Sequence, residues 1–74
     1  MKLVRESGKR TRYYSIALYP TLFNDFLLVR HYGDLNSPHA KKSYFGTKKE
    51  ALLFSLNLAA NKRSQGYKVL SLSR

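Results

Sequence analysis

The 74-residue chain contains no cysteine and no tryptophan, and only four of its residues are acidic. Without cysteine, the chain has no disulfide bond and no thiolate-ligated zinc or iron–sulfur site. Its longest apolar runs, 26–29 and 51–54, are far shorter than the 20 or so residues of a membrane-spanning helix. Its start is charged, at Lys2 and Arg5, which argues against a secretory signal peptide. We expect a cytoplasmic protein with no membrane partner.

Positive charge is what the chain has in excess. Fourteen lysines and arginines give a net charge of +10, and six tyrosines and four phenylalanines are interleaved with them. Cations neutralise the phosphates of a nucleic acid, while aromatic rings stack on its bases or sugars. The composition therefore predicts a nucleic acid as the first partner to test.

The hydrophobic pattern predicts three long strands and a short final one. Alternation and β-branched or aromatic residues place the strands at 13–19, 26–32, 41–45 and 67–72. The segment 33–40 contains Gly, Asp, Asn, Ser and Pro and is predicted to be a surface loop. Residues 1–11 are predicted to be a flexible basic arm, in which 2–5 can form a short first strand. The remaining residues, 12–74, are predicted to form one domain.

A single helix is predicted over 48–63. Thr47 and Glu50 have the spacing of a capping box, and Gly66 follows the last turn as a C-terminal cap. The expected fold is α+β, with three or four antiparallel strands and one helix packed on the sheet.

A helical wheel divides the faces of this helix. It directs four small or apolar side chains toward the sheet: Leu52, Ser55, Leu56 and Ala59. Leu53 and Phe54 fall beside the polar stripe and are predicted to form an exposed contact surface. The alternative is a broad buried face covered by the N-terminal arm.

Catalytic chemistry has little support in the sequence. No two of the four acids have a spacing that would make them an acid–base pair. His31 and His39 are not accompanied by ligands at metal-binding spacing, and the four glycines do not form a phosphate loop. We expect no enzyme activity, no cofactor and no metal.

Several segments together resemble the WGR domain family. They are Val29-Arg30-His31-Tyr32-Gly33-Asp34, Lys42-Ser43-Tyr44-Phe45, Lys49-Glu50-Ala51 and Lys62 with Gly66-Tyr67, spread over residues 12–68. The family is named for a Trp-Gly-Arg signature at the end of a central strand. It occurs in poly(ADP-ribose) polymerases and in stand-alone bacterial proteins. The resemblance implies a domain that binds DNA ends and contacts other protein domains.

The signature itself is altered in this chain. Tyr32 stands at the tryptophan position, Gly33 matches, and Asp34 stands where the family has arginine. Tyrosine can still stack on a sugar or base, whereas an aspartate would repel a phosphate. ADP-ribosyl transfer is not implied, because the catalytic domain of the polymerases is absent from this sequence.

Two functional hypotheses follow. The first is a non-enzymatic module that binds nucleic acid, DNA in preference to RNA, through Arg12, Arg30, Tyr32, Lys41, Lys42, Lys48 and Lys49. The amides at the helix start would add an attraction for phosphate. The second is a protein-interaction module, such as a homodimer, that uses Leu53 and Phe54.

Overall fold

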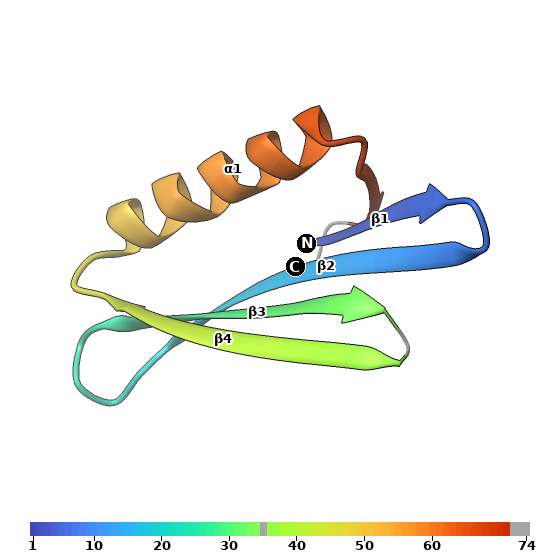
Figure 1. Ribbon diagram of the computed structural model, residues 1–74. Helices are drawn as coiled ribbons and strands as arrows, with labels where there is room; N and C mark the ends of the chain where they lie inside the picture. Colours follow the sequence, from blue (N-terminus) through green and yellow to red (C-terminus); the bar gives the residue numbers. More distant parts are fainter. Residues whose placement is uncertain (35, 72–74) are drawn as a thin grey trace.

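The fold is one antiparallel sheet with one helix packed on it (Figure 1). The structure is a computed structural model that describes residues 1–34 and 36–71. Its elements are β1 (Lys2–Ser7), β2 (Arg10–Pro20), β3 (Phe26–Asp34), β4 (Ser37–Phe45), α1 (Lys48–Ser64) and β5 (Lys68–Ser71). The strands lie in the order β4-β3-β2-β1-β5. The predicted α+β class is confirmed, although the sheet has five strands and not three or four.

Residues 2–7 belong to the sheet and do not form a free arm. β1 pairs with β2 on one side and with β5 on the other. Leu3 is fully buried in the core, and the Met1 ammonium donates a 2.8 Å hydrogen bond to the Ile16 carbonyl. The sequence hides this because Leu3 and Val4, the apolar residues of β1, are adjacent and so show no alternation.

β4 begins earlier than the sequence predicts. Residues 37–40, expected in a loop, pair with the end of β3, where His39 lies opposite Tyr32 and Pro38 opposite Gly33. Pro38 is tolerated because β4 is an edge strand, which has one side without ladder hydrogen bonds. The prediction of a long loop is wrong, since Asp34 at the end of β3 already pairs with Ser37 at the start of β4.

The helix boundaries agree with the capping residues. The Glu50 amide donates to the Thr47 hydroxyl at 3.2 Å, so Thr47 caps the start of α1. At the other end Gly66 has a φ of 98°, and the Tyr67 amide donates to the Lys62 carbonyl at 3.1 Å. This left-handed glycine turns the chain from α1 into β5. Residue 72 of the predicted final strand lies outside the described residues.

The helix presents a different face to the sheet from the predicted one. Its buried residues are Ala51, Ser55 and Ala59, spaced one turn apart. Leu52 and Leu56 are exposed by 42% and 56%, so the prediction that they face the sheet is wrong. Small side chains at the contact let the helix lie close above the rings of the sheet. Phe54, predicted to be exposed, is half-buried against Phe45 with 5.0 Å between ring centroids.

The two faces of the sheet have different environments. The helix side carries the core residues Leu3, Tyr14, Ile16 and Leu28. No described element covers the opposite face (Figure 1). Within the described residues, no helix has the length and apolar character needed to cross a membrane. The same residues contain no cluster of three or more metal-ligating side chains.

Candidate nucleic-acid interface

A pocket of about 360 Å³ lies on the helix side of the sheet, near the end of α1. We call it the tyrosine pocket. It is lined by Arg10, Arg12, Tyr14, Tyr32, Gly33, Asp34, Ser37, His39, Lys62 and Tyr67. These residues come from β2, β3 and β4, from the last turn of α1, and from Tyr67, which lies between α1 and β5. Folding thus brings cations and aromatic rings from distant segments to one place.

Three rings form a ladder across neighbouring strands at this pocket. Tyr32 stacks on Tyr14 with 5.6 Å between ring centroids, and on His39 with 5.4 Å. The register explains the ladder, because Tyr14, Tyr32 and His39 are directly opposite one another on β2, β3 and β4. Both faces of the Tyr32 ring therefore contact other rings. His39 is exposed and ends the ladder on the edge strand.

Lys62, one of the cations of the pocket, contacts two of its rings. The Lys62 Nζ lies 4.7 Å from the ring centroid of Tyr14 and 5.7 Å from that of Tyr67. Beside the pocket, the Arg5 guanidinium lies 5.7 Å from the Tyr67 ring and donates to the Gln65 carbonyl at 3.0 Å. Cation–π contacts hold these side chains in place without neutralising their charge. Their charge remains available for an anion.

The altered signature has a structural explanation at the end of β3. Gly33 has a φ of 121°, and a Cβ atom there would lie 2.2 Å from the Ser37 carbonyl oxygen. The Asp34 carboxylate accepts hydrogen bonds from the amides of Asn36 and Ser37, at 2.9 and 2.8 Å. Asp34 therefore stabilises the turn into β4, a role that aspartate commonly has in turns.

Arg30 lies one alternation before Tyr32, on the same face. Its guanidinium donates to the Tyr14 hydroxyl at 3.4 Å and lies 5.8 Å from the Phe54 ring. Its Nε atom is buried and has no hydrogen-bond partner. Lys41 is its cross-strand neighbour on β4. Arg30 and Lys41 thus extend the positive charge along the helix side of the sheet, next to the tyrosine pocket.

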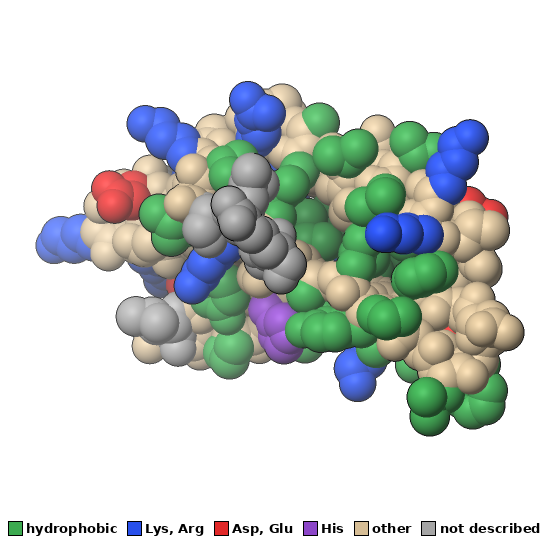
Figure 2. Space-filling view, turned by 180° about the vertical axis from the view of Figure 1, so that it is seen from behind, with side chains coloured by type: hydrophobic (Ala, Val, Ile, Leu, Met, Phe, Trp, Pro, Cys, Tyr) green, Lys and Arg blue, Asp and Glu red, His purple; other side chains and the backbone are tan. Residues whose placement is uncertain are grey.

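The other predicted cations lie elsewhere. Lys42 pairs with Val29 and projects from the opposite face of the sheet. Lys48 lines a groove of about 620 Å³ at the start of α1, and Lys49 is exposed there. The fourteen-residue separation of Lys48 from Lys62 corresponds to about 21 Å along a helix. Seen from behind, the molecule shows its Lys and Arg side chains well apart from one another (Figure 2).

Of the ten residues that line the pocket, eight were not among the predicted site residues: Arg10, Tyr14, Gly33, Asp34, Ser37, His39, Lys62 and Tyr67. His39 could have been found by extending β4 backward, since the register then places it opposite Tyr32. Lys62 and Tyr67 could not, because their positions depend on how α1 lies over the sheet. Of the predicted interface leucine and phenylalanine, Leu53 is 53% exposed, whereas Phe54 packs against the core.

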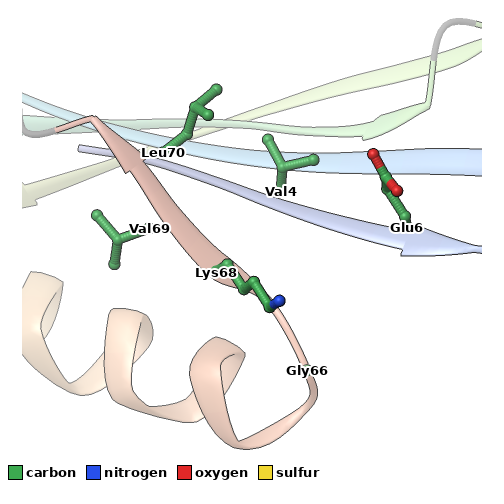
Figure 3. Close-up of a pocket in the computed structure, with 6 residues that line it drawn as sticks. All are labelled: Val4, Glu6, Gly66, Lys68, Val69 and Leu70. Atoms are coloured by element: carbon green, nitrogen blue, oxygen red, sulfur yellow. The ribbon is translucent and has the colours of Figure 1, made fainter.

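A further pocket of about 480 Å³ lies beside the edge strand β5 (Figure 3). It is lined by Val4, Glu6, Gly66, Lys68, Val69 and Leu70. In Figure 3, Val69 points toward the helix, while Val4, Glu6 and Leu70 point away from it. The lining therefore straddles the sheet edge, with one acid and one cation, and it does not concentrate one kind of chemistry.

Comparison with known proteins identifies the family of the chain. The model of the WGR domain family matches residues 1–73. The chain is 32% identical over 63 residues to the uncharacterized protein y4dW of Sinorhizobium fredii, an alignment that covers 84% of this chain and 31% of that protein. The chain thus spans about a third of the length of this relative. No solved structure matches the chain significantly. The chain belongs to the WGR domain family.

Proposed function

We propose that this WGR domain is a non-enzymatic module that binds nucleic acid, DNA in preference to RNA, at the tyrosine pocket. The observation that carries the proposal is the gathering of Arg10, Arg12 and Lys62 around Tyr32 in one pocket. Arg10 and Arg12 come from β2 and Lys62 comes from the last turn of α1, and the convergence of these two segments is not needed for solubility. The family is of a nucleic-acid-binding type, which is consistent with the proposal.

In this proposal the cations contact phosphates and the ring ladder contacts a base or sugar. The faces of the Tyr32 ring are lined by Tyr14 and His39, so Tyr32 offers its edge. The exposed ring of His39 offers the stacking surface at the end of the ladder. Arg30 and Lys41 lie alongside and would contact the neighbouring phosphates.

Binding is expected to depend little on base sequence. α1 carries Lys48 and Lys49 at its start and Lys62 and Arg63 in its last turn, so no basic stripe runs along its length. A helix that reads bases in the major groove presents such side chains along its exposed face. Contacts to the phosphates and to the end of the duplex would therefore contribute most of the binding free energy.

Removing a phosphate contact is expected to change the salt dependence of DNA binding. Replacing Arg12 with alanine should reduce the slope of log K against log salt by about 0.9, the share of one neutralised duplex phosphate. Fluorescence anisotropy with a blunt DNA duplex at several salt concentrations measures this slope. Lys49→Ala is the matched control, because Lys49 is exposed at the far end of α1. Equal slopes for the wild type and Arg12→Ala would contradict the proposed site.

The ring ladder makes a separate prediction. Tyr32→Ala should weaken binding to the blunt duplex by about 1–3 kcal/mol, because it removes the middle ring of the ladder and releases His39. Tyr32→Phe keeps the ring and should bind almost as the wild type does. Circular dichroism confirms that each variant is folded. An unchanged affinity for DNA in a folded Tyr32→Ala variant would show that Tyr32 is not part of the binding site.

A second candidate function is self-association through the helix. Leu52, Leu53 and Leu56 of α1 are exposed by 42%, 53% and 56%, outside the stripe of small residues that contacts the sheet. Phe54, which packs inward, no longer belongs to this surface.

If the leucines form a homodimer interface, sedimentation should show a mass that rises with concentration, and Leu53→Glu with Leu56→Glu should abolish the rise. Asn61→Glu, on the same helix, is the control for the added charge. A monomer at all concentrations would exclude this candidate.

A further inference from the structure

The face of the sheet opposite the helix has a composition of its own. We call it the open face. Its side chains form rows across the strands, set by the register: Tyr19–Leu27–Tyr44, then Ala17–Val29–Lys42, then Lys2–Ser15–His31, then Val4–Tyr13 with Lys68. None of these residues lines the tyrosine pocket. The open face is thus a separate surface of the domain.

The first two rows combine an apolar floor with exposed rings. Val29 is only 9% exposed although no element covers it, because its neighbours in the sheet surround it. Tyr19 and Tyr44, on either side of Leu27, are 53% and 64% exposed. Exposed aromatic rings on a sheet are the platform on which RNA- and single-strand-binding domains stack bases.

The third and fourth rows contain a shallow hollow of about 450 Å³, lined by Lys2, Tyr13, Ser15 and His31. The small Ser15 side chain leaves space between larger neighbours. A planar base could enter this space against the Tyr13 and His31 rings, with Lys2 beside it for the phosphate. The hollow therefore offers an aromatic surface, a hydrogen-bonding hydroxyl and a cation within one site.

The charge of the open face selects the class of ligand. Lys2, Lys42 and Lys68 project from it, and within the described strands Glu6 is its only carboxylate, at the end of β1 (Figure 3). A second copy of the chain packed face to face would bring these like charges together in a desolvated interface, which is costly. A polyanion with exposed planar groups matches both the charge and the rings.

We propose that the open face binds single-stranded nucleic acid through base stacking, at a site separate from the tyrosine pocket. The open face extends from the first row, at Leu27, to the fourth row, where Gly33 pairs with Tyr13. This distance is about 20 Å, at about 3.3 Å per strand residue. This length accommodates several nucleotides. A duplex would not use the face in this way, because its bases are already paired and stacked on one another.

The test compares a fluorescent oligothymidine with a blunt DNA duplex, by anisotropy. Tyr19→Ala combined with Tyr44→Ala should weaken oligothymidine binding at least about tenfold, since each stacked base contributes substantially to affinity. Binding of the duplex should change less than about twofold. Tyr19→Phe with Tyr44→Phe is the matched control and should retain oligothymidine binding, because both rings remain.

Three results would overturn the inference: unchanged oligothymidine affinity in the alanine pair, an equal loss in the phenylalanine pair, or a wild-type dimer that the alanine pair dissociates. The Arg12→Ala variant separates this inference from the proposed function. If the inference alone fails, Arg12→Ala still weakens binding of the duplex, while replacing the two tyrosines with alanine leaves the affinity for oligothymidine unchanged. If the proposed function alone fails, replacing the two tyrosines weakens binding of oligothymidine, while Arg12→Ala leaves binding of the duplex unchanged.

Discussion

Replacing Gly33 with alanine is expected to destabilise the domain by about 3 kcal/mol or more. The added Cβ would lie 2.2 Å from the Ser37 carbonyl oxygen, and a φ of 121° is unfavourable for any residue with a side chain. The oxygen is a backbone atom of the paired strand β4, so it cannot move without disturbing the ladder. A chain of this size buries only about 60% of its unfolded surface and has little stability to lose.

Gly46 provides the matched control for this substitution. A Cβ at Gly46 would meet nothing within 4 Å, so Gly46→Ala should leave the stability close to that of the wild type. Urea denaturation followed by circular dichroism measures both variants. If Gly33→Ala unfolds at the same urea concentration as Gly46→Ala, β3 and β4 do not lie as close together at Gly33 as the structure shows.

The second large effect is expected at the first strand. Leu3→Ala should cost about 2–5 kcal/mol, the range for truncating a buried leucine. Leu3 is fully buried and belongs to the same core cluster as Tyr14, Ile16 and Leu28. The loss would leave a cavity between β1 and α1 and would weaken the pairing of β5, which is attached to the sheet through β1.

Thermal unfolding measures this loss, with Lys2→Ala as the control. Lys2 is adjacent in sequence but exposed, and its side chain projects from the open face. A free N-terminal arm would predict that neither substitution changes the melting temperature. The structure predicts a large decrease for Leu3→Ala and a small change for Lys2→Ala.

The features that the sequence predicts well are determined locally. The helix boundaries follow from Thr47 and Gly66, whose preferred backbone conformations depend on a few neighbouring residues. Alternation correctly places Arg30 and Tyr32 on one face of β3 and His31 on the other. These predictions need no knowledge of the tertiary packing.

The features that the sequence misses depend on packing between distant segments. The wheel treats Leu52 and Leu56 as core because they are apolar, whereas the helix contacts the sheet through Ala51 and Ser55. Phe54 and Lys62 then fall on the inner side, where they contact rings of the sheet. Composition alone does not show that the space under the helix is already filled by tyrosines.

The candidate site was predictable in part for the same reason. Arg12 and Tyr32 were predicted, and both line the tyrosine pocket. Lys48 and Lys49 were grouped with them because cations at a helix start attract phosphate, but the length of α1 separates the two ends. Only the fold decides which cations converge.

The convergence of cations and rings at the tyrosine pocket is tested most directly by nuclear magnetic resonance. Backbone amide shifts would be recorded while a blunt DNA duplex is added to the isotope-labelled chain. The largest shift changes are expected at Arg12, Gly33, His39 and Lys62, and small changes at Lys48 and Lys49. Changes confined to the start of α1, or spread evenly over all the basic residues, would contradict this convergence.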